Sequence, residues 1–389
     1  MISETVIPLS VPNLKGNELK YVTNAVETEW VSTAGPYVEE FEKKTAEYLH
    51  TEAATSCQNG TAGLHIALMM CNVTRDDMVI VPTLTFIAAV NPVAYIGAEP
   101  LFMDCDDSLC MDPVKLLRFC EEECEIQEDK LIYKASGKCI KAVVVVHVFG
   151  NMADMERILQ IAEKYHLKVV EDATEAIGTY YTSGKYAGEY AGTMGDIGVY
   201  SFNGNKIITT GGGGMIVARD QKVLQHAKHL TTQAKADTLN FIHDEIGYNY
   251  RMTNLQAALG LAQLEQLEKF IQTKKENYER YRSAIDQIPG LEMLNFKDGV
   301  RANYWFYSVF CKEDYPMKRD ELIRYLSEHH VQSRPIWGLI SEQKPYAGAK
   351  TYQIEKAQYS QQSVVNIPCS TNLRAEDIDR IIELLHSII

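Results

Sequence analysis

The chain has 389 residues, of which 46% are hydrophobic, and its formal net charge is −14. This length supports a sizeable core and either two domains or one large domain with an appendage. The chain has no basic run, which argues against a nucleic-acid partner, and no apolar run long enough to span a bilayer.

Residues 1–5 lack the basic start and the long apolar stretch of a signal peptide, so we expect a cytoplasmic protein with no membrane association. The nine cysteines are scattered and odd in number, which fits reduced thiols. Cys120, Cys124 and Cys139 lie close in sequence, but they form no CxxC pair and have no histidine between them. We therefore expect buried thiols here, and no metal site.

Residues from about 35 to 214 alternate between helical and strand-like patterns, which is typical of an α/β fold with a mostly parallel sheet. The segment 141–148 is almost continuously apolar, as parallel strands buried on both faces are. Asp112 followed by Pro113 predicts the start of a helix. The other helices and strands expected in this part are 36–44, 64–70, 78–82, 100–104, 155–165, 167–171, 196–202 and 214–218.

The remaining sequence predicts an inserted hairpin and a second, smaller α+β domain. Residues 120–141 are charged and interrupt the α/β alternation, so we interpret them as a surface hairpin. Residues 254–285 form one long helical pattern with Thr253 as its cap. We expect a large domain over 1–250 and a small one over 251–389, with the N-terminal segment able to pack on the small domain. The other elements expected in the small domain are a strand at 304–309 and helices at 318–328 and 375–388.

Two side chains next to predicted strands carry the strongest chemical signal. Lys206 lies between the strand 196–202 and the glycine run 211–214. Most lysines are solvated surface charges, but one buried at such a turn can lose its proton and form a Schiff base. Asp172 follows the strand 167–171, at the carboxyl edge where open α/β sheets bind ligands. It can pair with a protonated pyridine nitrogen, although without the lysine a helix cap or loop aspartate is the simpler interpretation.

A phosphate-binding turn is predicted at residues 59–63, where glycines precede a helix whose first N–H groups can bind an anion. An ordinary capped helix is the alternative. The Ser201 hydroxyl could bind the same phosphate, and Phe86 could cover one face of a ring. Two nucleotide motifs are absent: no GxxxxGK[ST] occurs, and Ile216 replaces the third glycine of GxGxxG. Together these residues indicate a phosphorylated, planar, electron-withdrawing cofactor.

With these motifs in place, the chain resembles the DegT/StrS-type nucleotide-sugar aminotransferases, which are fold type I enzymes that use pyridoxal phosphate. The resemblance extends from residue 7 to the C-terminal helix. In segments 209–214, 231–235 and the inserted hairpin it looks closest to the branch that aminates a UDP-linked 4-keto-6-deoxy-N-acetylhexosamine, as in bacillosamine and legionaminic acid pathways. The motifs that carry the family resemblance are Asn59-Gly60-Thr61, Pro82-Thr83-Leu84-Thr85-Phe86, Glu171-Asp172-Ala173-Thr174-Glu175, Ser201-Phe202-Asn203-Gly204-Asn205-Lys206 and Gly247-Tyr248-Asn249-Tyr250-Arg251-Met252.

The resemblance implies a role for each matching residue. Lys206 matches the Schiff-base lysine, and Asp172 matches the partner of the pyridine nitrogen. Glu175 matches the residue near the ring hydroxyl, where many members carry glutamine. Asn249 matches an asparagine lent to the neighbouring subunit's phosphate site, which implies a homodimer with shared active sites. The other expected cofactor-binding residues are Gly60, Thr61, Ala62, Phe86, Ser201 and Asn203. The expected substrate-binding residues are Arg251, Arg334 and Trp337. Arg251 either assists Asn249 at the phosphate site or only anchors its loop.

The implied activity is transfer of an amino group from L-glutamate to C4 of a UDP-linked 4-keto-6-deoxy-N-acetylhexosamine, with pyridoxal phosphate as cofactor. The alternatives are a dTDP- or GDP-linked 4-keto-6-deoxyhexose as acceptor, and a cofactor-binding regulator without turnover. The 3-dehydratases of the family are a further alternative, but they replace the Schiff-base lysine by histidine, and Lys206 argues against that branch.

Overall fold

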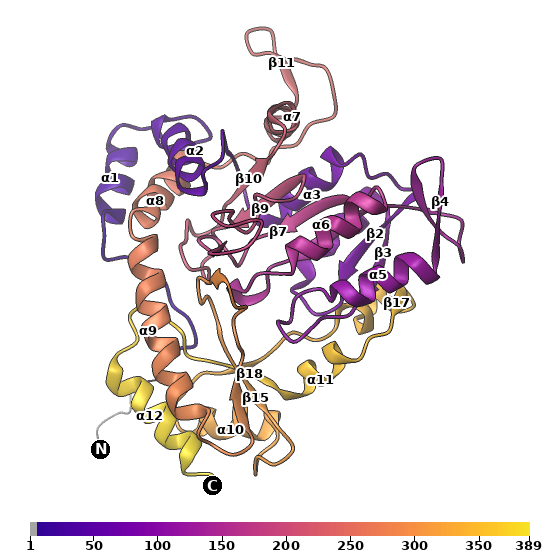
Figure 1. Ribbon diagram of the computed structural model, residues 1–389. Helices are drawn as coiled ribbons and strands as arrows, with labels where there is room; N and C mark the ends of the chain where they lie inside the picture. The colour runs from indigo at the N-terminus through magenta and orange to yellow at the C-terminus, as the bar shows by residue number, and fades with distance from the viewer. Residues whose placement is uncertain (1–5) are drawn as a thin grey trace.

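A computed structural model describes residues 6–389 (Figure 1), so the segment 1–5 used in the signal-peptide argument lies outside the described residues. Over this range the dominant feature is a ten-stranded sheet. A hairpin is attached beside its main path. That path runs β1 (Thr55–Cys57), β10 (Gly214–Ala218), β9 (Ile197–Ser201), β7 (Lys168–Asp172), β6 (Cys139–Val146), β2 (Asp77–Pro82), β3 (Glu99–Met103) and β17 (Lys350–Tyr352).

Neighbouring strands are parallel from β9 to β17, whereas β10 is antiparallel to both β9 and β1. The expected mostly parallel α/β fold is therefore confirmed. The centre of the sheet is buried on both faces, with α3 packed against β9 and β10 on one side and α5 and α6 on the other (Figure 1). The helices of this part are α1 (Glu18–Glu27), α2 (Pro36–Leu49), α3 (Gly60–Met70), α4 (Asn91–Ile96), α5 (Pro113–Glu122), α6 (Met155–Lys164) and α7 (Gln221–Thr231).

The inserted hairpin is confirmed, with narrower limits than expected. It consists of β4 (Cys124–Gln127) and β5 (Lys130–Tyr133), and β5 also pairs with the first residues of β6. Residues 120–122 belong to α5 instead. The hairpin thus lies at the amino end of β6, whereas ligands of open α/β sheets bind at the carboxyl end.

The long helix expected over 254–285 is wrong in one respect, because it is divided into α8 (Asn254–Leu264) and α9 (Leu267–Ile285). No glycine or proline marks the break. The side chains of Glu265 and Gln266 are instead hydrogen-bonded to residues of α1, which holds the chain at the point where it changes direction. A local helical pattern cannot reveal such a tertiary contact.

Helix starts follow the expected capping chemistry in two cases and differ in a third. Asp112 accepts hydrogen bonds from the backbone of the first turn of α5, and Thr253 forms a capping box with Gln256. The helix expected to begin at residue 64 begins at Gly60 instead, because the Asn59 side chain already caps it there.

A second sheet lies in the C-terminal part, and Figure 1 shows it below the large sheet. The expected strand 304–309 begins three residues later, because Tyr304 has a left-handed φ of 56° and residues 304–306 form a loop. The four antiparallel strands are, in order, β13 (Leu291–Met293), β15 (Tyr307–Cys311), β18 (Val364–Ile367) and β16 (Arg334–Pro335). The helices of this part are α9, α10 (Arg319–Glu328), α11 (Lys356–Ser363) and α12 (Ala375–His386).

The N-terminal segment contacts this second sheet region, and one C-terminal strand returns to the large sheet. Ile7 exchanges backbone hydrogen bonds with His330 and Gln332, and Leu9 accepts one from Cys369. Strand β17 pairs with β3 of the large sheet. Because the chain crosses in both directions, a division at residue 250 stays a proposal.

Two short ribbons complete the fold. β8 (Tyr180–Tyr181) pairs with β14 (Val300–Arg301), and β11 (Lys235–Asp237) pairs with β12 (Ile242–His243). Figure 1 shows the β11 ribbon projecting beyond α7, away from the sheets. Among the helices of residues 6–389, none combines the length and hydropathy that crossing a bilayer requires.

Candidate active site

A cavity of about 340 Å³ opens at the carboxyl edge of the large sheet. Asp172 is the last residue of β7 and Ser201 the last of β9, so two neighbouring parallel strands end in its wall. Lys206 enters from the turn that follows β9, and the start of α3 closes another side. The residues lining the cavity are Asn59, Gly60, Thr61, Leu64, Thr85, Phe86, Ala88, Ala89, Asp172, Thr174, Glu175, Ser201, Asn203, Asn205, Lys206, Trp305 and Trp337.

Lys206 presents its amine to two carboxylates inside the cavity. Its Nζ lies 3.8 Å from Glu175 Oε1, and the lysine side chain is only 14% exposed. Burial lowers the pKa of the Lys206 amine, while the charges of Glu175 and Asp172 act in the opposite direction. The Lys206 amine therefore begins to lose its proton at a lower pH than the amine of a surface lysine does. A nucleophile or a base requires this neutral form.

Glu175 is buried beside the lysine and is held by the backbone. Its Oε2 accepts a hydrogen bond of 2.8 Å from the Phe149 N–H. Burial raises the pKa of Glu175 to about 7, opposed by the Lys206 charge and by this hydrogen bond. At neutral pH the carboxyl group can therefore either accept or donate a proton.

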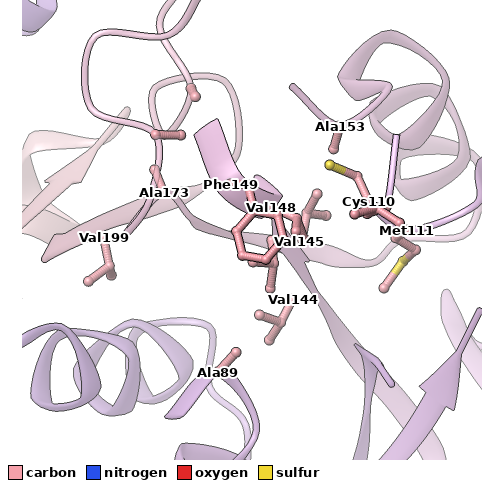
Figure 2. Packing of buried hydrophobic residues seen from close by; sticks show 14 of the residues in the cluster. Ala89, Cys110, Met111, Val144, Val145, Val148, Phe149, Ala153, Ala173 and Val199 are labelled. Atoms are coloured by element: carbon pink, nitrogen blue, oxygen red, sulfur yellow. The ribbon is translucent and has the colours of Figure 1, made fainter. Parts of the chain in front are cut away.

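Phe149 positions that N–H through an unusual backbone conformation. It follows β6 and has a left-handed φ of 56°, which is uncommon for a bulky residue. Its ring lies among buried side chains that include Val145, Val148 and Ala173 (Figure 2). The same ring packs 4.7 Å from Trp337, centroid to centroid. Core packing thus keeps the turn that aims the amide at Glu175, and no sequence pattern predicted this role.

Asp172 is nearly buried and faces the cavity. Its Oδ1 accepts a hydrogen bond of 3.1 Å from the Thr174 N–H. Burial raises its pKa, an effect that Thr174 and the Lys206 charge oppose. A cationic partner in the cavity would stabilise the carboxylate form, as the pairing with a pyridinium nitrogen requires.

The residues behind Asp172 form a rigid buried support. Glu171 accepts hydrogen bonds from the Gly192, Met194 and Gly195 amides and contacts His147 Nε2 at 2.9 Å. His147 Nδ1 accepts from the Ala153 N–H, so Nε2 carries the proton that is donated to Glu171. This network fixes the end of β7 and therefore the direction of the neighbouring aspartate.

The start of α3 meets the requirements of a phosphate cradle. The first intrahelical hydrogen bond runs from the Gly63 N–H to Asn59 O, so the amides of Gly60 and Thr61 precede it and face the cavity. A Cβ added at Gly60 would lie 3.0 Å from Ser201 Cβ, so glycine keeps a gap open between helix and strand. The residues present therefore fit the phosphate of pyridoxal phosphate.

One member of the expected cradle is placed differently. The Ala62 N–H donates a hydrogen bond of 2.8 Å to Asn59 Oδ1, and Ala62 does not line the cavity. We expected the Ala62 amide to bind phosphate, but the capping asparagine already satisfies it. Asn59 therefore orients the two preceding amides, and the cap chemistry of Asn followed by Gly was the signal for it.

Three further predicted residues lie in the cavity wall. Phe86 is 55% exposed, Trp337 is half-buried, and Asn203 accepts the Lys206 backbone N–H at 3.0 Å. Phe86 and Trp337 thus supply aromatic surfaces at the cavity. Asn203 shapes the turn that carries the lysine, while its exposed side chain has no assigned contact.

Besides Ala62, three predicted residues do not line the cavity of their own chain. Asn249 is exposed and forms an isolated bridge with Thr232. Arg251 donates a hydrogen bond to Thr33 O, and Arg334 is exposed on β16. Their roles toward phosphate or sugar stay predictions, and a second subunit is needed for the role given to Asn249.

One group of metal-type side chains occurs among the described residues, away from the cavity. It consists of His229, Asp244 and Glu245. His229 Nε2 contacts Asp244 Oδ1 at 2.7 Å, which an imidazole–carboxylate hydrogen bond explains, and both carboxylates are largely exposed.

The comparisons with known proteins agree with this site. The model of the DegT/DnrJ/EryC1/StrS aminotransferase family matches residues 12–386. The chain belongs to this family. It is therefore a pyridoxal-phosphate-dependent sugar aminotransferase, and the residues of the cavity fit that cofactor.

Individual relatives cover most of the chain. The GDP-perosamine synthase of Escherichia coli O157:H7 is 39% identical over 331 residues, which are 85% of this chain and 84% of the relative. The GDP-perosamine synthase of Caulobacter vibrioides is 34% identical over 390 residues, 98% of each chain. The crystal structure of a DegT DnrJ EryC1 StrS aminotransferase from Brucella abortus has a TM-score of 0.86 at 27% identity, covering 95% of each chain.

Proposed function

We propose that this enzyme transfers an amino group from L-glutamate to C4 of a nucleotide-linked 4-keto-6-deoxy sugar, with Lys206 as the covalent attachment point of the cofactor. The observation that carries the proposal is one cavity that holds a desolvated lysine, a strand-end aspartate and an open helix N-terminus. When bound, pyridoxal phosphate supplies an aldehyde for an amine and a ring that accepts electrons.

The residues of the chain divide the remaining tasks. Gly60 and Thr61 amides hold the phosphate, and Asp172 keeps a proton on the ring nitrogen by its charge. Lys206 Nζ, as a free neutral amine, would take the proton from the α-carbon of the donor and deliver it to the cofactor carbon that carried the aldehyde. In the second half-reaction it would take a proton from that carbon and deliver it to C4 of the sugar. Glu175 lies 3.8 Å away and exchanges a proton with the lysine.

The nucleotide of the acceptor is proposed from the relatives and from the position of the hairpin. Two relatives are named for a GDP-linked amino sugar. The hairpin behind the UDP-N-acetylhexosamine hypothesis lies at the amino end of β6, opposite the cavity edge. We therefore favour a GDP-linked 4-keto-6-deoxyhexose and keep the UDP-linked 4-keto-6-deoxy-N-acetylhexosamine as the second candidate, supported by the sequence resemblance.

The oligomeric state and the compartment are part of the same proposal. A homodimer is inferred because Asn249 lies outside the cavity of its own chain. A cytoplasmic location agrees with nine free cysteines. A regulator without turnover is disfavoured, since the lysine, the aspartate and the cradle are all in place.

Borohydride reduction of the holoenzyme tests the attachment point. Peptide mapping should find a pyridoxyl group on Lys206, and Lys206→Ala should carry none while still folding. The control Lys228→Ala, at a surface lysine paired with Glu42, should retain the label on Lys206. A pyridoxyl group on another lysine of the wild-type enzyme would contradict the assignment.

A panel of acceptors tests the substrate. The panel consists of GDP-, UDP- and dTDP-linked 4-keto-6-deoxy sugars, and the UDP-linked sugar carries an acetamido group. Their kcat/KM values are compared at saturating L-glutamate, and the products are identified by mass spectrometry. Buried polar groups left unpaired by the wrong acceptor cost about 1–3 kcal/mol, roughly fivefold to more than a hundredfold in rate. A preference for the UDP-linked sugar would favour the second candidate. If none of the sugars is aminated, the proposed function is wrong.

A further inference from the structure

Trp305 contacts the turn that carries Lys206, although it lies far away in sequence. It belongs to the loop before β15 and is 3% exposed. Its indole N–H donates a hydrogen bond of 2.8 Å to the carbonyl oxygen of Asn205. The Lys206 Nζ lies 4.2 Å from the centroid of its ring. One side chain therefore holds the backbone next to the lysine and covers the amine itself.

The backbone of Trp305 is in turn fixed to the opposite wall of the cavity. Its N–H donates to Asn303 Oδ1 at 3.0 Å. The Asn303 amide group donates to the carbonyl oxygens of Glu175 and Ile177, at 2.9 and 3.0 Å. The loop 303–305 thus connects the segment of Glu175 with the turn of Lys206.

A buried lysine outside the cavity completes this arrangement. Lys274, on α9, is 3% exposed and donates a hydrogen bond of 2.9 Å to the carbonyl oxygen of Trp305 and another to that of Cys369. Within residues 6–389 no carboxylate is among the groups that shift its pKa, and burial lowers the pKa of its amine. Burying a lysine without a carboxylate partner is costly, and the partners of Lys274 are two carbonyl oxygens and the Tyr307 ring, whose centroid is 5.4 Å away.

We propose that Trp305 is a positioning residue for Lys206 and that Lys274 holds Trp305 in place through its backbone carbonyl. The turn needs such support. Its neighbours Asn203 and Asn205 are exposed, and glycines at 204 and 211–214 loosen the chain on both sides. The proposal rests on the proposed function only in that Lys206 is the reactive amine.

The test uses PLP-free protein, so its main readouts do not depend on turnover. Trp305→Phe keeps a ring over the amine but removes the indole N–H, and Trp305→Leu removes the ring as well. Trp337→Phe, at the other cavity tryptophan, is the matched control. Hydrogen–deuterium exchange of residues 203–208 and the rate of acylation of Lys206, read by mass spectrometry, are measured at one pH for each folded variant.

We expect amide exchange in 203–208 to rise about fivefold to tenfold in Trp305→Phe, as the loss of one hydrogen bond predicts. Acylation of Lys206 should rise further in Trp305→Leu, because the amine is uncovered. Trp337→Phe should change neither quantity. In the holoenzyme, Trp305→Phe should lower kcat while the KM for the nucleotide sugar stays within about twofold, since phenylalanine keeps an aromatic ring in the cavity wall.

Lys274→Met provides a second route that leaves Trp305 itself unaltered. It removes the donor but keeps a long apolar side chain, and exchange in 203–208 should rise in the same direction. Unchanged exchange and acylation in folded Trp305→Phe and Lys274→Met would overturn the proposal. A pyridoxyl group mapped to another lysine would overturn the proposed function instead, and the exchange results would still stand.

Discussion

Burial moves three ionisable side chains of the cavity in the same sense, toward loss of charge. It lowers the pKa of Lys206 and raises those of Asp172 and Glu175. Because the lysine and Glu175 lie 3.8 Å apart, each charge favours the other, and the pair can exchange a proton within the cavity. This is the property that a proton-transferring amine needs near neutral pH.

The stability of the PLP-free protein should depend on Glu175 in a predictable direction. Its pKa is about 7 in the folded protein, against an ordinary 4.5, so the folded state binds this proton more tightly. The protein therefore loses stability as pH rises from about 4.5 to about 7, by a total on the order of 3 kcal/mol from this group. Glu175→Gln, which can still accept the Phe149 N–H, should be more stable than wild type at pH 8 and similar at pH 4.5.

The measurement is denaturant unfolding of both PLP-free proteins between pH 4.5 and 8. Glu163→Gln, an exposed position on α6, serves as the control and should follow the wild-type curve. Parallel curves for Glu175→Gln and wild type would show that Glu175 keeps its charge in the folded protein.

The hairpin β4–β5 lies at the amino end of β6, away from the cavity, so a change in it can alter the stability of the protein without altering catalysis. Its two-residue loop consists of Glu128 and Asp129, with φ values of 49° and 61°. The left-handed conformation is unfavourable for glutamate and less favourable for aspartate than for glycine, whereas Asn-Gly favours such a turn.

We predict that Glu128→Asn combined with Asp129→Gly raises the free energy of unfolding by about 1 kcal/mol. The kcat/KM for the nucleotide sugar should not change, because the hairpin lies at the amino end of β6. Thermal unfolding and steady-state kinetics check both parts. A changed kcat/KM would indicate that the hairpin reaches a substrate site and would support the branch assignment based on it.

At the scale of the whole molecule, the proposed homodimer accounts for features that one chain leaves without a role. Asn249 follows the projecting ribbon of β11 and β12 and does not line the cavity of its own chain. Leu239 and Phe241 in the loop of this ribbon, and Ile246 just after it, are 84%, 71% and 83% exposed. Grouped apolar side chains of this kind mark interaction surfaces.

Mixed dimers test whether Asn249 acts in the partner's site. Lys206→Ala and Asn249→Ala homodimers should each be poorly active, but a heterodimer should contain one intact site and recover up to about half of the wild-type activity per dimer. Differently tagged subunits allow the heterodimer to be isolated and its composition verified. Activity no higher than that of the two homodimers would falsify the role in trans.

The sequence alone determined the α/β class, the cofactor and the candidate lysine and aspartate. Apolar strands, capping residues such as Asp112 and Thr253, and short motifs at strand ends are local signals that need no distant partner. Only the tertiary structure decided the break between α8 and α9 and the entry of Trp305 beside Lys206. These features depend on contacts between segments that are far apart in the sequence. Such contacts exist only once the elements have packed, so no local pattern could contain them.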